Sequence, residues 1–199
     1  MVSDTFTMPE RIEGERIVLV RPYPVTMELA TEMFGYVEAS RDSLQEWLSW
    51  VSYTQTPEDE YQHWLIDWCL KGWEAGTGFA YMMRDKQTNQ FLGVVELFRL
   101  DKQNRWAEFG YWLSEEACGH GYVREALLIL ERMAFEQGLN RLVIRNDVEN
   151  IRSIHVAERL GYHLDGVMRA EEWSPYWNMY RDKNVWSKLK SEWETEQKK

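Results

Sequence analysis

A loop in the middle of the chain has the residue types of an anion-binding turn. Residues 111–123 read YWLSEEACGHGYV, so that an apolar run leads into a loop with glycines at positions 119 and 121. Glycines let the backbone curl until successive N–H groups converge, and the N-terminus of a following helix adds its own N–H groups. Such a loop can cradle a pyrophosphate, although an ordinary tight turn explains two glycines equally well.

A second polar motif follows the glycine loop, and neither motif matches a common nucleotide-binding signature. No Lys-Ser or Lys-Thr pair follows Gly121, and the third glycine of the dinucleotide fingerprint is missing. The second motif is Asn150-Ile151-Arg152-Ser153. Asn150 stands where a helix cap belongs and Ser153 stands in the first turn. The two residues therefore either cap a helix or face a ligand that lies across a sheet.

The elements that must position these motifs follow from the periodicity of the apolar residues. Alternation predicts strands at residues 16–22, 79–84, 91–98, 106–113, 142–145, 163–169 and 183–189. Apolar spacing and caps predict helices at residues 27–37, at 44–51, from Thr56 onward, from Tyr122 to Gly138 and at 151–160. The three strands between residues 79 and 113 are expected to form an antiparallel meander. The polar last ten residues are expected to fray.

The order of the elements indicates an α+β fold. One strand and two helices precede the meander, and helix, strand, helix and two strands follow it. A Rossmann chain alternates strand and helix throughout, so this order does not fit one. A chain of 199 residues can bury a core without disulfides, and we predict one domain over residues 1–199 with its core at about 16–189.

The two motifs together, at this separation, resemble the acetyl-CoA signature of the GNAT superfamily. Within it, GYWLSE…GHGY, N-x-x-S and ERLGYHLDG are similar to ribosomal-protein N-terminal acetyltransferases of the RimJ/RimL type. The resemblance covers residues 16–189 and implies a GNAT fold, with a mixed, mostly antiparallel sheet of about seven strands and helices on both faces. One departure is Glu116, because the superfamily usually has Gln or Arg there. An anionic side chain beside a pyrophosphate must point away.

The resemblance also implies roles for individual residues. The backbone of Trp112 and Leu113, at a splayed part of its strand, is expected to pair with the pantetheine arm of acetyl-CoA. The pyrophosphate is expected to lie on the loop of Cys118, Gly119, His120, Gly121, Tyr122 and Val123. Asn150 is expected to hydrogen-bond the cofactor, and Ser153 to lie beside the thioester sulfur. Glu172 matches the base of the similar enzymes, provided that no gap separates it from Ser153.

The chemistry of amine acetylation requires such groups. A free α-amine has a pKa of about 8 and is mostly protonated at neutral pH, so a base must accept a proton before or during attack. A backbone N–H can stabilise the oxyanion, and a serine hydroxyl can assist the departing thiolate. Glu96, Glu108 and Glu171 are the alternative bases. Glu108 lies on a central strand, where other branches of the superfamily place a base.

Composition limits the partners. Aspartate and glutamate total 33 against 23 lysines and arginines, and the net charge of −10 argues against general nucleic-acid binding. The charge is compatible with a basic substrate or simply with solubility. Cys69 and Cys118 provide no disulfide framework, no histidines are spaced for a metal, and no secretory signal or membrane span is visible, so the cytoplasm is expected. The 11 tryptophans either fill the core or form stacking walls.

The sequence therefore predicts an acetyl-CoA-dependent N-acetyltransferase, without a metal, that acts on a primary amine. The N-terminal α-amine of a protein such as a ribosomal protein is the favoured acceptor. The resemblance allows a homodimer, since relatives are often dimers, but the sequence leaves the oligomeric state open. The alternatives are a small-molecule detoxifying enzyme, a polyamine or amino-sugar acetyltransferase, and a CoA-binding regulator without turnover. Presence of both Ser153 and Glu172 favours an enzyme over a regulator.

Overall fold

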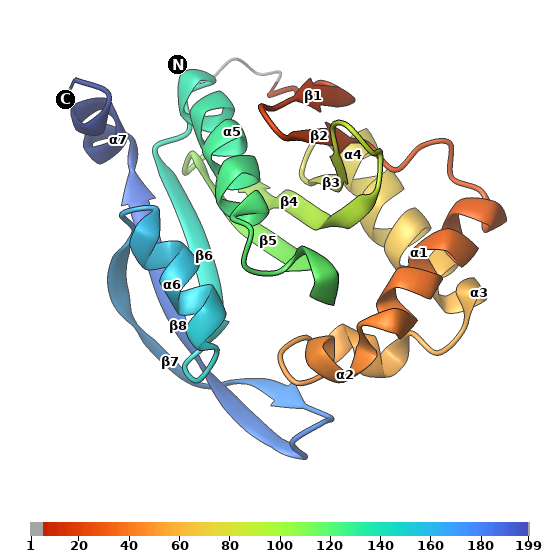
Figure 1. Ribbon diagram of the computed structural model, residues 1–199. Coiled ribbons are helices and arrows are strands. Elements are labelled where there is room, and N and C mark those ends of the chain that lie inside the picture. The colour runs from red at the N-terminus through yellow and green to blue at the C-terminus, as the bar shows by residue number, and fades with distance from the viewer. Residues whose placement is uncertain (1–5, 199) are drawn as a thin grey trace.

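A mixed eight-stranded sheet organises the fold in the computed structural model, which describes residues 6–198 (Figure 1). Its strands are β1 (Arg11–Glu13), β2 (Ile17–Val20), β3 (Phe79–Asp85), β4 (Phe91–Asp101), β5 (Trp106–Leu113), β6 (Arg141–Asp147), β7 (His163–Ser174) and β8 (Met179–Leu189). Their order across the sheet is β1-β2-β3-β4-β5-β6-β8-β7. Only β5 and β6 run parallel among the neighbouring strands of the described chain. The α+β class and the antiparallel meander β3-β4-β5 are confirmed.

Two strand predictions need correction. The sheet has eight strands instead of about seven, because β1 pairs with β2 at the edge although it is only three residues long. Three residues are too few to show a period of two. The last two strands are also longer than expected, since β7 and β8 continue together as a hairpin that extends beyond β6.

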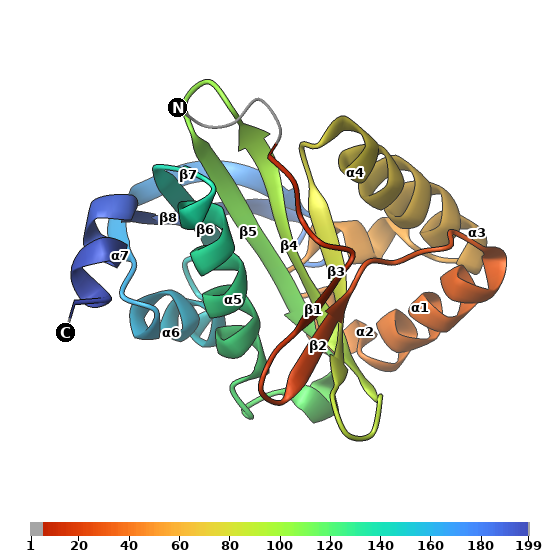
Figure 2. The same ribbon diagram turned by 90° about the horizontal axis from the view of Figure 1, so that it is seen from above.

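Helices cover both faces of the sheet, as the sequence predicts (Figure 2). On one face lie α5 (Tyr122–Glu136) and α6 (Ile151–Arg159), whose apolar residues pack into the larger core cluster. On the other face lie α1 (Met27–Ala39), the short α3 (Pro57–Asp59), the π-helical η2 (Glu60–Leu70) and α4 (Lys71–Ala75). The side chains of Thr26 and Thr56 cap α1 and α3, so both predicted helix starts are confirmed.

The prediction of one helix across residues 44–51 is wrong. The chain instead forms α2 (Arg41–Leu44), a turn, and the 3₁₀ helix η1 (Ser49–Tyr53). The guanidinium of Arg41 donates to the carbonyl oxygens of Val51 and Thr54 at 2.7 and 2.6 Å, which draws this segment back on itself. The two short helices bury Leu44 and Val51, whereas Trp47 and Leu48 lie between them and are only partly buried.

The C-terminal segment is helical rather than frayed. Lys190–Glu196 form α7, and Trp193 packs its ring against Phe135 with the ring centroids 5.5 Å apart. The buried ammonium of Lys188 lies 2.8 Å from Glu196 and 3.3 Å from Glu131, which fixes α7 to α5. No helix among residues 6–198 has the length and apolar character that a bilayer span needs.

Candidate active site

The sheet opens between β5 and β6, its two parallel strands. Residues 106–109 of β5 pair with residues 141–144 of β6, but no later residue of β5 finds a partner on β6. Residues 110–113 continue to pair with β4 on their other side. The polar groups of the backbone edge that faces β6 are therefore left without a strand partner, which is the splay expected at Trp112 and Leu113.

The glycine loop at the end of β5 has the form of an anion cradle. Gly119 and Gly121 both adopt φ of +81°, a left-handed conformation that strains other residues. A Cβ at Gly119 would meet no atom within 4 Å, and at Gly121 only the Nη2 atom of Arg16 at 3.7 Å. Among residues 6–198, no acceptor pairs with the backbone N–H groups of residues 119–124. The loop therefore presents converging donors and positive φ angles that suit a pyrophosphate.

The side chains of the loop leave this cradle accessible. Glu116 accepts a 3.4 Å hydrogen bond from Gln90 and thus turns toward the β3–β4 hairpin, as an anion beside a phosphate site must. The thiol of Cys118 donates to the carbonyl oxygen of Ser114, and the side chain of His120 is exposed. Val123 is buried in the core and anchors the first turn of α5.

Two hydroxyl groups meet beside the open edge of β5. Tyr111 points to the α6 face, where its hydroxyl lies 2.8 Å from Oγ of Ser153. Burial raises the pKa of Tyr111 to about 12, so this phenol stays protonated at neutral pH. A hydroxyl group of this pair can donate a hydrogen bond or a proton to a leaving thiolate. Tyr111 was not predicted from the sequence as a site residue, since only strand alternation hints that it faces opposite to Trp112.

Asn150 has the capping role that the sequence suggested. Its side-chain oxygen accepts from the backbone N–H of Ser153 at 3.1 Å and starts α6. This hydrogen bond holds Ser153 in the first helical turn, close to Tyr111. The contact of Asn150 with a cofactor remains a prediction.

Glu172 lies on the opposite face of the sheet from Ser153, close to the N-terminal helices. Its carboxylate accepts from the hydroxyl of Ser49 and lies 2.8 Å from the ammonium of Lys183. Its neighbour Glu171 pairs with Arg145 at 3.2 Å instead. The strand is irregular here, with a register shift between Met168 and Glu172 and a positive φ at Ala170, so strand alternation does not decide which of the two glutamates faces the amine site.

The alternative bases differ in how strongly they are paired. Glu108 is buried between Arg99 at 3.1 Å and Arg145 at 3.4 Å, which makes it part of an ion-pair network. Within residues 6–198, Glu96 accepts one hydrogen bond, from the indole of Trp68 at 2.5 Å. Burial raises the pKa of Glu96 to about 7, close to the value that suits a general base at neutral pH. Glu96 is therefore the strongest alternative to Glu172.

The tryptophans divide between core and surface. Trp112 and Trp186 are buried, and Trp50, Trp64, Trp73 and Trp193 pack against the two core clusters. Trp68, Trp173 and Trp177 are exposed to about two-fifths of their area and lie on the face of the N-terminal helices and the β7–β8 hairpin. The indole of Trp177 donates to the carbonyl oxygen of Glu46 at 3.2 Å and links that hairpin to the segment after α2. Core filling explains most of the tryptophans.

The described part of the chain contains no preformed metal-binding site. No group of three or more His, Cys, Asp and Glu side chains is arranged there to hold an ion. The candidate site consists instead of the cradle, the open edge of β5, the Tyr111–Ser153 hydroxyl pair and two carboxyl groups on the opposite face.

Comparison with known proteins identifies the family of the chain. The family model described as "Acetyltransferase (GNAT) domain" matches residues 19–163. The ribosomal-protein-serine acetyltransferase of Escherichia coli (strain K12) is 31% identical over 147 residues, which are 73% of this chain and 79% of that protein. YdaF of Bacillus subtilis (strain 168) is 35% identical over 156 residues, 74% of this chain and 80% of that protein.

Solved structures share the architecture. The complex of RimL, a ribosomal L7/L12 alpha-N-protein acetyltransferase, with coenzyme A superposes with a TM-score of 0.80 at 25% identity, covering 90% of this chain and 98% of that chain. The microcin C7 self immunity acetyltransferase MccE superposes with a TM-score of 0.81 at 24% identity, covering 92% and 97%, which shows the fold alone. The chain therefore belongs to the GNAT acetyltransferase family and is an N-acetyltransferase similar to enzymes of the RimL type.

Proposed function

We propose that the enzyme transfers the acetyl group of acetyl-CoA to the N-terminal α-amine of a protein such as a ribosomal protein. The observation that carries this proposal is the open edge of β5, which leads from the glycine cradle to the Tyr111–Ser153 hydroxyl pair. Coenzyme A bound to RimL gives the precedent for the cosubstrate, and the ribosomal-protein acetyltransferase of Escherichia coli gives the precedent for the acceptor.

The residues of the cradle and the open edge fit acetyl-CoA. The backbone N–H groups at Gly119, His120, Gly121, Tyr122 and Val123 would hold the pyrophosphate, and Cys118 begins this turn. The backbone of Trp112 and Leu113, at the open end of β5, would pair with the amides of the pantetheine arm. The side-chain N–H₂ group of Asn150 remains able to donate to the cofactor, since its oxygen alone caps α6.

Acetyl transfer then needs one proton acceptor and one proton donor. Glu172 removes a proton from the ammonium or the attacking amine, a C–N bond forms at the acetyl carbonyl carbon, and the C–S bond breaks. A backbone N–H of the open edge stabilises the oxyanion of the tetrahedral intermediate. The hydroxyl of Ser153, hydrogen-bonded to Tyr111, donates to the departing thiolate. Glu96 is the second candidate for the base, because burial raises its pKa to about 7.

A protein amine is favoured over a small molecule for two reasons. Two relatives more than 30% identical include a ribosomal-protein acetyltransferase, and a net charge of −10 steers a basic substrate toward the enzyme. The exposed Trp173 and Trp177 keep a small-molecule acceptor as the second candidate, because exposed indoles can stack on a ring.

Binding of acetyl-CoA tests the first half of the proposal. Acetyl-CoA at a hundred times its Kd should stabilise the fold by about 2.7 kcal/mol and raise the melting temperature accordingly. Gly121→Asp should abolish the shift, since it adds a side chain and a negative charge where φ is +81°. An unchanged melting temperature of the wild-type protein in saturating acetyl-CoA would contradict the proposal.

A further inference from the structure

We propose that Arg16, immediately before β2, binds the pyrophosphate of coenzyme A and supplies the positive charge that the glycine loop itself lacks. The inference rests on the proposed function, because it assigns a further residue to the same cosubstrate. It concerns a side chain more than a hundred positions away from the loop in the sequence, and one that neither of the two motifs contains.

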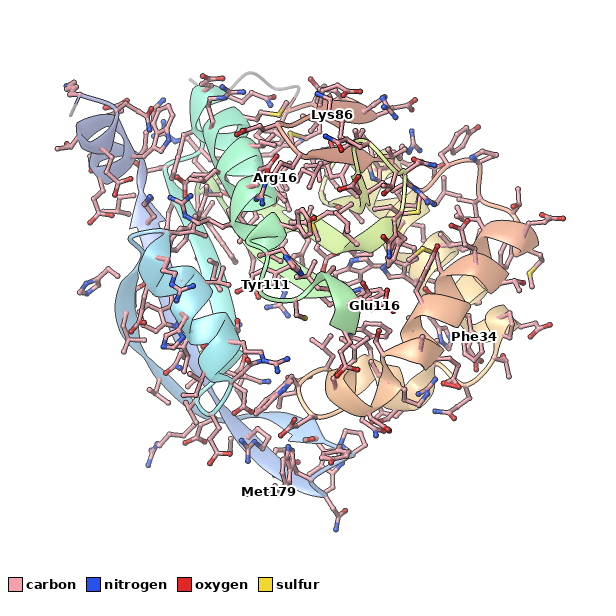
Figure 3. All side chains as sticks on the ribbon, in the orientation of Figure 1. Arg16, Phe34, Lys86, Tyr111, Glu116 and Met179 are labelled. Atoms are coloured by element: carbon pink, nitrogen blue, oxygen red, sulfur yellow. The ribbon has the colours of Figure 1, made fainter. Side chains whose placement is uncertain are left out.

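Arg16 is held against the loop by three kinds of contact. Its backbone N–H and its Nε both donate to the carboxylate of Glu125 in α5, at 2.8 and 2.9 Å. Its Nη1 donates to the carbonyl oxygen of His120 at 2.9 Å, and its guanidinium lies 5.0 Å from the ring centre of Tyr122. Figure 3 labels Arg16 in front of α5, apart from Glu116. The guanidinium is therefore oriented before any ligand binds.

The guanidinium still has free donors on the side of the cradle. A guanidinium carries five N–H groups, of which Glu125 and the carbonyl of His120 occupy two. Neither N–H of Nη2 has an acceptor among residues 6–198, and this atom lies 3.7 Å from the position of a Cβ at Gly121. The side chain is 48% exposed, so an anion can reach it. A planar pair of donors matches two phosphate oxygens.

The loop itself contains no cation. Residues 111–123 contain Glu115 and Glu116 but no lysine or arginine. Glu116 occupies the position at which the superfamily usually has Gln or Arg, and its side chain turns away toward Gln90. Lys86, a further cation near this edge of the sheet, already donates to the carbonyl oxygen of Gly14 and pairs with Glu13. Arg16 is thus a cation that the fold brings to the cradle from a distant part of the sequence, in addition to Arg124 in the first turn of α5.

Ligands that lack successive parts of the cofactor test the assignment. Isothermal titration should be made with coenzyme A, with dephospho-CoA, which lacks the 3′-phosphate, and with pantetheine, which lacks every phosphate. Arg16→Ala should weaken coenzyme A and dephospho-CoA equally, by about 10- to 100-fold, because a charge-assisted hydrogen bond is lost. The affinity for pantetheine should stay the same. Arg16→Lys should recover part of the loss, because it restores the charge without the planar fork.

Two matched variants separate ligand binding from a structural role. Glu125→Gln weakens the anchor of Arg16 but leaves its charge, so it should keep or raise the affinity for coenzyme A. Arg11→Ala removes an exposed arginine whose one ion-pair partner in the described part of the chain is Glu13 on β1, and it should change nothing. Arg16 would be merely structural if Arg16→Ala and Glu125→Gln weakened all three ligands alike.

Three other outcomes would also decide the question. Unchanged binding of coenzyme A by Arg16→Ala overturns the inference, and a loss confined to coenzyme A overturns it by moving the contact to the 3′-phosphate. In both cases the wild-type protein still binds coenzyme A, and the proposed function stands. A wild-type protein that binds none of the three ligands contradicts the proposed function itself and this inference with it.

Discussion

The carboxyl group of Glu96 on β4 lies directly over Gly110 on β5, at the first residue of β5 that no longer pairs with β6. A Cβ at Gly110 would lie 2.9 Å from Cγ of Glu96 and still closer to Oε1, so only glycine leaves room for this carboxyl group. The next residue, Tyr111, points to the other face and meets Ser153. An acid and a hydroxyl pair thus flank the same open edge.

This contact predicts a strong coupling between positions 110 and 96. Gly110→Ala should lower the free energy of unfolding by about 1–3 kcal/mol, because the added methyl group overpacks the site. In a Glu96→Ala background the same change should cost much less, since the obstructing carboxyl group is gone. Urea denaturation of the four proteins measures the coupling. Additive costs would show that Glu96 does not occupy the space above Gly110.

The assignment of the base is tested by pH–rate profiles. Glu172→Gln should lower kcat by about 10²–10⁴-fold near neutral pH, and the loss should shrink at high pH, where the amine is already deprotonated. Glu171→Gln, the matched neighbour that pairs with Arg145, should keep a wild-type profile. A crippled Glu171→Gln beside a normal Glu172→Gln would move the role back by one residue.

Glu96→Gln belongs in the same series. With Glu172 as the base, this variant should retain most of its kcat. If instead Glu96→Gln loses the activity and Glu172→Gln does not, Glu96 is the base, and the wild-type rate should then fall as the pH drops below about 7, where the Glu96 carboxyl group takes up its proton.

Ser153→Ala should lower kcat more than it lowers the affinity for acetyl-CoA. A hydroxyl that assists departure of the thiolate acts mainly in the transition state, so its loss belongs in kcat. Tyr111→Phe removes the partner at 2.8 Å and should have a smaller effect of the same kind. Full kcat in Ser153→Ala would leave Ser153 as a residue of the helix turn only.

The burial of Glu60 leads to a prediction about stability rather than catalysis. It is 1% exposed, its Oε2 has no partner among the described residues, and burial raises its pKa to about 7. Between pH 4.5 and 7 the folded state therefore binds more protons here than the unfolded state, so this residue makes stability fall as the pH rises. Glu60→Met should remove that fall, by about 3 kcal/mol at pH 8. Thermal unfolding of both proteins at pH 5 and pH 8 measures it, and parallel pH dependences would contradict the account.

Patterns within short stretches of the sequence predict the parts of the candidate site that are formed by local backbone structure. The glycines of the cradle, the cap at Asn150 and the strand that runs into the loop are all properties of short segments. The residues that reach the site from other elements carry no such signal. Arg16 and Tyr111 acquire their contacts only when β2, α5, β5 and α6 come together, because nothing in their own neighbourhoods marks them.

The errors in the fold have the same origin. The spacing of Leu44 and Val51 suits one helix, but long-range hydrogen bonds from Arg41 favour two short ones. The C-terminal residues look too polar to order, yet Lys188 and Trp193 fix α7 to the core through contacts with α5. In both places tertiary contacts outweigh the local apolar pattern.

The most direct test of the central claim is the release of coenzyme A thiol from acetyl-CoA in the presence of two otherwise identical peptides. One peptide is basic and has a free N-terminal serine, and the other has the same sequence with a blocked N-terminus. Spermidine and an amine-bearing antibiotic serve as small-molecule acceptors. We expect thiol release with the free peptide alone, and acetylation of its α-amine in the mass spectrum. Equal rates with the blocked peptide, or release only with a small molecule, would contradict the proposed acceptor, and no release with any amine would contradict the enzyme's proposed activity.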